Sequence, residues 1–384
     1  MQRFGAGLRS LFWLDERLCF LNHGSFGACP KSVLEAQTAW RIRMEQDPIR
    51  FMVHVLPEAL RAQAEKLGGL LGARGLDLAF VENATTGVNA VLGGLDLQPG
   101  DELLTLSHVY PAVDNTIRVL AERYGCKVVQ AKLPMPLKGP EQVIEAVKAK
   151  LTDKTKIAVL DHVTSFSAVV TPIADLVALC HAQGVPVLVD GAHAPGMIAL
   201  DLEDLGADYY VGNCHKWLWA PKGCAFLHVR RDMQSGVRPP VISLREAEGF
   251  PFNFDWTGTK DASAYLSLGA ALEFHSWLGG NAVAQYNHEL VVDASSRLAD
   301  RLGWELAAPV SMTGSIRAMR IPDTGNATRE DAAALHNYLA DTHQIEVLVH
   351  AHHDLWVRVS AQVYNEREDY QRLLEALREW RSIS

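Results

Sequence analysis

Short apolar runs rich in Val, Leu and Ile alternate with longer amphipathic segments between residues 75 and 230. The apolar runs predict seven strands, at Leu76–Val81, Glu102–Leu106, Lys127–Ala131, Lys156–Asp161, Val185–Asp190, Tyr209–Gly212 and Ala225–Val229. The segments between them predict helices at Thr86–Leu95, Ala112–Tyr124, Gly139–Leu151 and Ile173–Gln183. Apolar strands separated by helices of about 10–15 residues are typical of a parallel sheet covered on both faces. We therefore expect an α/β fold with a mostly parallel, seven-stranded sheet flanked by helices.

The pattern changes after residue 260. A long amphipathic stretch predicts a helix over Ser263–Trp277 and on through Arg301. Further strands are expected near Gly303–Ala308, Ser315–Ile321, Ile345–Val349 and Leu355–Val359, and helices at Arg329–Thr342 and Glu366–Trp380. This order indicates a smaller C-terminal α/β domain with a predominantly antiparallel sheet. We expect an N-terminal segment (1–20) near the small domain, a large domain (21–265) and a small domain (266–384).

The composition excludes several classes of protein. The 384 residues are 48% hydrophobic, 21% charged and 8% aromatic, which is ordinary for a globular protein. A net charge of −9 with no basic run argues against nucleic acid as a partner. No apolar run approaches the roughly 18 residues of a membrane span, and residues 1–18 lack the apolar core of a signal peptide. We expect a cytoplasmic protein without a membrane partner.

The six cysteines are scattered along the chain without a CxxC pair. Isolated cysteines of this kind are typical of buried free thiols rather than of zinc ligands. We therefore expect no metal site built from them.

The strand end after Val81 leads into a turn with hydroxyl side chains, Glu82–Asn89, that opens a helix at once. Free N–H groups and the positive end of the helix dipole at such a place suit a phosphate. An ordinary threonine N-cap would give the same pattern. From this turn alone both interpretations stay open.

Two further strand ends carry polar groups that are unusual beside apolar strands. Asp190 ends one strand, and a carboxylate buried there needs a partner, such as a helix N-terminus, a metal or a cationic ring nitrogen. Lys216 follows another strand and precedes an aromatic run, where desolvation would lower its pKa towards that of a nucleophilic amine. The alternative for Lys216 alone is a loop lysine that reaches into solvent.

The three features together describe a site for pyridoxal 5'-phosphate. The phosphate would lie on the helix N-terminus, Asp190 would pair with the pyridinium nitrogen, and Lys216 would form the Schiff base. Lys222 is the nearest rival for the Schiff base, but it lies in a Pro-Lys-Gly turn, and we place it below Lys216.

The chain resembles the class V aminotransferase family of fold-type I pyridoxal-phosphate enzymes, and within it the isopenicillin-N-epimerase-like branch. The motifs that carry the resemblance span nearly the whole chain, at 21–27, 83–87, 108–110, 161–165, 190–193, 215–217, 256–259 and 358–365. The resemblance implies a homodimer with its active site at the subunit interface.

The resemblance also implies roles for single residues around the cofactor. Lys216 would carry it and move the substrate α-proton, Asp190 would bind the ring nitrogen, and His193 would approach the ring's phenolic oxygen. The expected phosphate ligands are Ala84, Thr85, His215 and, from the other subunit, Thr259. Ser165 is a further expected cofactor-binding residue, and Tyr110 is expected to stack on the ring.

On the substrate side, the resemblance implies that Arg358 clamps the α-carboxylate with two parallel hydrogen bonds. Asn22 and His23 would line the same side, and His23 and Tyr110 are catalytic candidates beside Lys216. The related cysteine desulfurases carry a sulfur-accepting cysteine on a loop before this arginine. Residues 349–358 contain no cysteine here, which argues against persulfide chemistry.

The same stretch holds His350, His352 and His353, whose spacing matches no strong metal site. We interpret them as a solvated turn or as polar groups that line the substrate entrance.

Pyridoxal phosphate by itself permits several reactions at the α-carbon, and the protein selects one of them. We expect an enzyme that acts at the α-carbon of an amino acid, most like an epimerase or racemase. Such an enzyme needs Lys216 and a second acid–base, sought among His23, Tyr110 and His108. The alternatives are a carbon–sulfur β-lyase on cysteine conjugates or sulfoxides, of the ergothioneine type, a class V aminotransferase, and a non-catalytic relative of the fold, which the intact cofactor set argues against.

Overall fold

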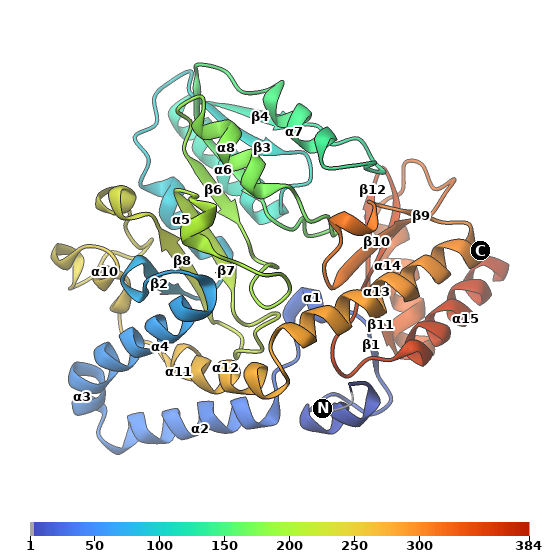
Figure 1. Cartoon of the computed structure of the whole chain (residues 1–384), viewed down its shortest axis with the longest axis horizontal. Helices are drawn as coiled ribbons and strands as arrows, with labels where there is room; N and C mark the ends of the chain where they lie inside the picture. Colours follow the sequence, from blue (N-terminus) through green and yellow to red (C-terminus); the bar gives the residue numbers. More distant parts are fainter. Residues whose placement is uncertain (1–3, 384) are drawn as a thin grey trace.

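A seven-stranded sheet lies at the centre of the computed structural model, which describes residues 4–383 (Figure 1). Its strands are β2 (Leu78–Val81), β3 (Glu102–Leu106), β4 (Lys127–Ala131), β5 (Thr155–Asp161), β6 (Val187–Asp190), β7 (Tyr209–Asn213) and β8 (Ala225–Val229). Their order is β2-β8-β7-β6-β5-β3-β4. Strand β8 runs in the opposite direction to the other six strands of this sheet. The predicted α/β fold with a mostly parallel sheet is confirmed.

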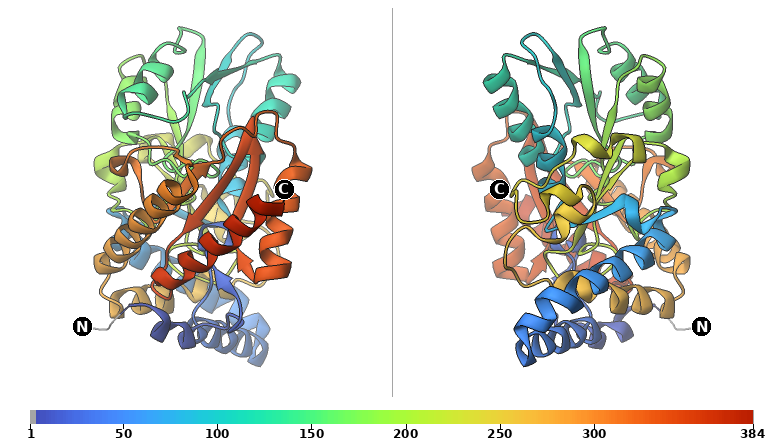
Figure 2. Two further views of the ribbon diagram at one scale, coloured as in Figure 1. Left: turned by 90° about the vertical axis from the view of Figure 1, so that its right-hand side faces the viewer. Right: turned by 90° about the vertical axis from the view of Figure 1, so that its left-hand side faces the viewer.

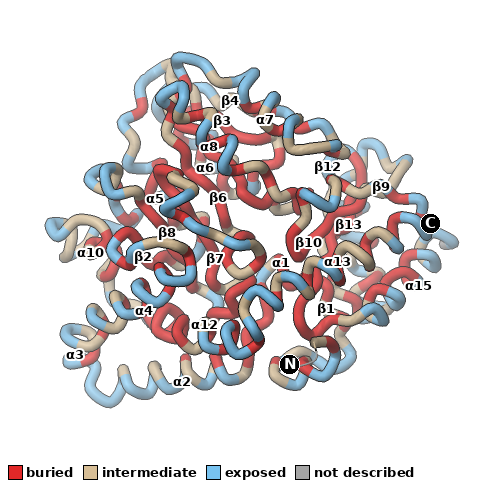
Figure 3. Tube along the Cα trace, viewed as in Figure 1, coloured by how far each residue is buried: buried red, intermediate tan, exposed pale blue. Residues whose placement is uncertain are grey.

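Helices cover both faces of this sheet, which explains the continuous apolar strands. Val187 and Val189 belong to one buried cluster, with side chains of α7 (Glu141–Lys148) and α8 (Ile173–His181). Leu188, between them, belongs to a second cluster with side chains of α5 (Ala84–Gly93) and α6 (Pro111–Tyr124). Because successive strand residues point to opposite faces, every position of a doubly covered strand is apolar. Figure 3 shows the resulting band of burial through the central strands.

The N-terminal third of the chain adds helices around the lower part of the large sheet in Figure 1. They are α1 (His23–Phe26), α2 (Lys31–Gln46), α3 (Pro48–Arg50) and α4 (Leu56–Leu71). Two short helices, α9 (Leu202–Leu205) and α10 (Phe252–Asp255), lie later in the chain.

The expected long helix after residue 263 is broken into three. The pieces are α11 (Ser263–Leu266), α12 (Leu268–Trp277) and α13 (Asn281–Leu302). Gly279 and Gly280 separate the last two, with φ angles of 97° and 56°. Both angles lie in the left-handed region, which ends an α-helix, so the continuous amphipathic pattern alone was misleading here.

The C-terminal region contains the expected antiparallel sheet. Strands β9 (Glu305–Leu306), β10 (Ile316–Arg320), β12 (Leu348–His352) and β13 (Asp354–Ser360) pair in the order β12-β13-β10-β9. Helices α14 (Arg329–Asn337) and α15 (Arg367–Ile383) complete it. The single strand predicted over 345–349 is divided, because β11 (Ile345–Glu346) leaves this sheet to pair in parallel with β1 (Cys19–Phe20).

The N-terminal segment is tied to the C-terminal region. Cys19 and Leu21 are buried in the cluster that includes Val291 of α13 and Val357 of β13. Figure 2 shows this blue segment beside the orange and red elements. We propose that the chain divides into domains near residue 265, as the sequence pattern indicates. Residues 1–3 of the expected N-terminal segment lie outside the described residues, and so does residue 384 of the expected small domain.

All six cysteines are free, and five of them are buried, in agreement with the sequence interpretation. None of the helices within residues 4–383 combines the length and the apolar character needed to cross a membrane.

The turn after β6 leaves no room for a side chain at Gly191. A Cβ on Gly191 would lie 2.2 Å from the ring of Tyr210, which is fully buried and bonded through its hydroxyl to Nδ1 of His162 at 2.9 Å. We expect Gly191→Ala to lower the free energy of unfolding by about 1–3 kcal/mol in urea titration, through overpacking. Gly69→Ala on α4, where a Cβ meets nothing within 4 Å, should instead raise it by about 0.5–1 kcal/mol. Equal stability of both variants would contradict the packing described.

Candidate active site

A cavity of about 640 Å³ opens where the parallel strands of the large sheet end. Parallel strands place their carboxyl ends at one edge, so residues distant in sequence meet there. Eight of the predicted site residues line it: Ala84, Thr85, Tyr110, Ser165, Asp190, His193, His215 and Lys216. The expected cofactor residues are thus brought together, with the exception of Thr259.

Lys216 is the amine in this cavity. Its Nζ lies 3.1 Å from Nε2 of His193. Burial, with a smaller effect from the nearby Arg358 cation, lowers the pKa of Lys216 from 10.5 to about 7, although Asp190 acts in the opposite direction. A substantial fraction of Lys216 is therefore a neutral amine near pH 7, the form that attacks an aldehyde.

Two carboxyl groups lie side by side near Lys216. Asp161 and Asp190 are direct partners in the parallel pairing of β5 and β6, and both are buried. Asp190 accepts one hydrogen bond, from the backbone N–H of Ala192 at 3.0 Å. Burial raises the pKa of Asp190, and burial together with Asp190 raises the pKa of Asp161 well above its usual range. A cationic group between the two carboxyl groups would lower both pKa values again.

The N-terminus of α5 forms another wall. Asn83 caps the helix, since its side-chain oxygen accepts from the backbone N–H of Thr86 at 2.9 Å. The N–H of Ala84 already donates to Asn213 Oδ1 at 2.9 Å, so Ala84 contributes position rather than a free donor. Thr85 lies in the first turn, where N–H groups have no acceptor inside the helix. The helix end therefore suits an anion at Thr85.

His215 adds a ring nitrogen near this wall. Its Nδ1 is bonded to the carbonyl oxygen of Cys224 at 3.0 Å, which leaves Nε2 for a ligand. Burial lowers the pKa of His215 to about 4, and the Lys216 charge acts in the same direction. Lys222 also lines the cavity.

Arg358 lies directly behind the cavity wall. Its Nη1 donates to the carbonyl oxygen of Ser165 at 2.5 Å, and its Nη2 donates to Ser25 Oγ at 3.1 Å and to Asn22 Oδ1 at 3.3 Å. Burial lowers the pKa of Arg358 to about 10. No acidic side chain within residues 4–383 forms an ion pair with it. A buried cation without a counter-ion suits an anionic ligand.

His23 does not line the cavity. Its Nδ1 lies 2.7 Å from the Tyr364 hydroxyl, and its Nε2 lies 3.1 Å from the Lys216 carbonyl oxygen and 3.1 Å from Gln362 Nε2. Burial lowers the pKa of His23 to about 3. Both ring nitrogens are occupied by protein groups, which fits support of the Lys216 backbone better than proton transfer to a substrate. Asn22 likewise lies behind the wall, beside Arg358.

The other candidates for a second acid–base differ in their surroundings. Tyr110 lines the cavity and is 43% exposed, at the start of α6. His108 is buried, and its Nδ1 lies 2.9 Å from Ser167 Oγ. Burial lowers the pKa of His108 to about 3. Of the three histidines in the 350–353 hairpin, His350 and His352 line an adjoining cavity, whereas the side chain of His353 is 74% exposed.

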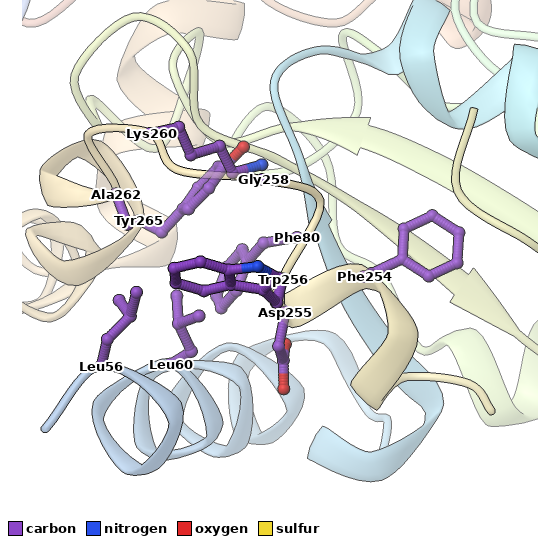
Figure 4. A pocket seen from close by; sticks show the side chains of 10 residues that line it. All are labelled: Leu56, Leu60, Phe80, Phe254, Asp255, Trp256, Gly258, Lys260, Ala262 and Tyr265. Carbon is purple, nitrogen blue, oxygen red and sulfur yellow. The ribbon is translucent and has the colours of Figure 1, made fainter. Parts of the chain in front are cut away.

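Thr259 is exposed and lies on a loop outside the cavity. The next residue, Lys260, bonds to Glu82 at 2.9 Å, and Glu82 lines the cavity. Figure 4 shows how the loop is anchored: Trp256 packs beside Leu60, and Lys260 lies over Tyr265. The loop therefore reaches the rim of the cavity without sending Thr259 into it.

Several residues of the site belong to motifs that the sequence analysis recognised, but they were given no role there. Asp161, Ser25 and Phe26 line the cavity, and only the pairing of β5 with β6 places Asp161 beside Asp190. Gly27 was part of a recognised motif, but only the tertiary structure shows why this position needs a glycine. A Cβ there would lie 2.6 Å from the carbonyl oxygen of His215, and its φ is +71°.

The cavity fits pyridoxal phosphate on its own chemistry. Asp161 Oδ2 and His193 Nδ1 are buried and have no hydrogen-bond partner within residues 4–383. A pyridinium N–H and a phenolic oxygen are groups that would satisfy such atoms. A neutral amine at Lys216 and an anion-binding helix end at Thr85 complete the requirements of the cofactor.

Comparisons with known proteins agree with this geometry. The family described as "Aminotransferase class-V" matches residues 27–373. An isopenicillin N epimerase from Amycolatopsis lactamdurans is 34% identical over 97% of this chain and 98% of its own length. An L-cysteine desulfhydrase from Arabidopsis thaliana is 33% identical over 94% of this chain and 87% of its own.

Solved structures show the same fold. A cystine C-S lyase in complex with cysteine persulfide has a TM-score of 0.82 at 23% identity, over 94% of this chain and 97% of its own. A variant of that lyase carries glycine covalently linked to its pyridoxal-phosphate cofactor. The chain therefore belongs to the class V aminotransferase family and is a pyridoxal-phosphate-dependent enzyme.

Proposed function

We propose that this enzyme is a carbon–sulfur β-lyase that acts on a cysteine-derived amino acid. The observation that carries the proposal is the asymmetry of the acid–base groups. Lys216 is a cavity-lining amine with a pKa lowered to about 7, whereas His23 and His108 are bonded to protein groups with pKa values near 3. Elimination needs one base, and epimerisation needs two on opposite faces of the α-carbon.

The names of the relatives support both reactions, since they include L-cysteine desulfhydrase and isopenicillin N epimerase. The lack of a cysteine in residues 349–358 supports simple elimination rather than sulfur transfer to the protein. Epimerisation, the first expectation from the sequence, becomes the second candidate, for which Tyr110 is the one proposed second acid–base that lines the cavity together with Lys216.

We assign the residues as follows. Arg358 binds the substrate α-carboxylate, and Lys216 removes the α-proton. Asp190 and Asp161 hold a proton at the pyridine nitrogen, and His193 orients the Lys216 amine through the 3.1 Å contact. Bound pyridoxal phosphate supplies the electron sink for the α-carbanion.

Around the phosphate we assign Thr85 and His215, with Ala84 setting the helix end. Tyr110 covers the ring, and Ser165 connects the cofactor side to Arg358 through its carbonyl oxygen. Thr259 would reach the phosphate of a second subunit, since its loop meets the cavity rim while Thr259 itself is exposed and does not line the cavity. This assignment requires a homodimer.

The overall reaction is balanced with water as the co-reactant. The Cα–H and Cβ–S bonds break, and the sulfur leaves with the bonding electron pair and takes up a proton. Water hydrolyses the released enamine, so a cysteine conjugate and water give a thiol, pyruvate and ammonia.

The reaction type is tested by incubating the holoenzyme in heavy water with a panel of amino acids and cysteine conjugates. We expect proton NMR to show pyruvate and free thiol in equal amounts, with no accumulation of D-amino acid. Exchange of the α-proton in a substrate that otherwise stays intact, followed by loss of optical purity, would replace the lyase with the epimerase.

The role of Lys216 predicts a pH dependence for cofactor capture. The neutral amine reacts, so the rate at which apoenzyme takes up pyridoxal phosphate should rise to a plateau with a midpoint near pH 7. With a lysine of ordinary pKa, the rate of uptake would instead keep rising about tenfold per pH unit until the pH approaches 10.5. The visible absorption band of the covalently linked cofactor reports the reaction with the amine, and cofactor that is bound without this link does not give the band. Lys216→Ala should lose the band and Lys222→Ala should keep it, and the reverse pattern would make Lys222 the cofactor lysine.

The role of Arg358 predicts a specific kinetic defect. Arg358→Lys replaces a planar fork by a point charge, and we expect KM for an α-amino acid substrate to rise about 10–100-fold with a smaller change in kcat. Arg317→Lys is the matched control, because Arg317 on β10 is also buried but bonds to Ser295 and Ser296 of α13 and to the carbonyl oxygen of Ala308. A KM that stays at the wild-type value in Arg358→Lys would remove Arg358 from the substrate site.

A further inference from the structure

A second cavity of about 770 Å³ adjoins the cofactor cavity. The two share Tyr110 and Ser165 in their walls. The second one lies between the loops after β3 and β5 on one side and α14 and β12 on the other. Since Arg358 bonds to the Ser165 carbonyl oxygen, the carboxylate-binding arginine lies at the wall that both cavities share.

Four rings form a compact group at this wall, which we call the imidazole cluster: His108, Phe166, His350 and His352. The Phe166 ring is central, with its centroid 4.7 Å from His108, 4.9 Å from His350 and 4.8 Å from His352. His108 and His352 meet edge to face at 5.6 Å. These spacings are those of favourable aromatic pairs, so the cluster presents flat ring surfaces.

His350 has unsatisfied hydrogen-bonding groups in this cluster. Both its ring nitrogens are buried, and neither has a hydrogen-bond partner among the described residues. A neutral imidazole carries one donor and one acceptor. Leaving buried polar groups unpaired is costly, so their presence beside an open cavity points to a ligand that pairs with them.

The imidazoles are uncharged at neutral pH. Burial lowers the pKa of His350 and of His108 to about 3, and it also lowers the pKa of His352. The charges of Arg358, His352 and His108, which face His350, also lower its pKa. An uncharged cluster offers no counter-ion, and the Arg358 cation beside it disfavours a cationic ligand.

We propose that the imidazole cluster binds the sulfur substituent of the substrate and selects planar, uncharged aromatic groups, above all those with a ring nitrogen that pairs with His350. This assignment rests on the proposed lyase function. It makes the substrates aromatic or heteroaromatic S-conjugates of cysteine rather than cysteine itself. Arg358 would hold the α-carboxylate, and the substituent would extend past Ser165 into the second cavity.

Turnover tests the proposal with three matched substrates: S-methyl-, S-phenyl- and S-(4-pyridyl)-L-cysteine. Ratios of variant to wild-type kcat/KM cancel the different leaving abilities of the thiols. Phe166→Ala should lower pyruvate release from both aryl conjugates about 10–100-fold and change the S-methyl value less than about threefold. His350→Phe keeps the ring and should lose only the preference for pyridyl over phenyl. His353→Asn, at the exposed tip of the hairpin, should leave all three unchanged.

Binding separates this proposal from the lyase assignment. Calorimetry on Lys216→Ala enzyme loaded with pyridoxal phosphate measures affinity for the three conjugates without turnover. An aryl preference that Phe166→Ala removes supports the subsite, even if wild-type enzyme releases no pyruvate, in which case the lyase function alone falls. Equal affinity for methyl and aryl conjugates, or equal losses for all three in Phe166→Ala, would overturn the subsite.

Discussion

Burial of charge without a protein counter-ion is the constraint on which this site depends. Arg358 is buried among neutral oxygens, Lys216 lies near it, and both have lowered pKa values for that reason. Asp190 and Asp161 form the complementary strained pair, with raised pKa values. Such an arrangement is expensive in an empty protein, and groups of opposite charge on a ligand relieve it. A carboxylated substrate and a protonated pyridine ring supply those charges.

The N-terminal segment connects the two charged centres. Cys19 and Leu21 pack into the small-domain core, while His23, two residues later, contacts the Lys216 carbonyl oxygen. Gly27 then passes so close to His215 that no side chain fits. The segment thus holds the arginine of the small sheet and the lysine of the large sheet in a fixed relation, which a reaction at one carbon atom requires.

The choice of reaction depends on groups in front of the lysine rather than on the cofactor set. Epimerisation and β-elimination both begin with removal of the α-proton, and only epimerisation then needs a second acid–base on the opposite face of the α-carbon. Here His23 and His108 are bonded to protein groups, and a wide cavity with the imidazole cluster in its wall adjoins the cofactor cavity. Both features favour β-elimination, in which a sulfur substituent leaves, over epimerisation, in which a proton returns to the α-carbon.

The sequence by itself determined the sheet and the cofactor class, because these depend on local patterns. Strand periodicity is read residue by residue, Asp190 is the last residue of β6, and Lys216 lies three residues after the end of β7. The tertiary structure alone decided the rest, since it depends on contacts between distant segments. Strand pairing placed Asp161 beside Asp190, and the N-terminal turn drew His23 behind the lysine. The hairpin of the small sheet carried His350 to Phe166, nearly two hundred residues away in the chain, and no local pattern encodes such a meeting.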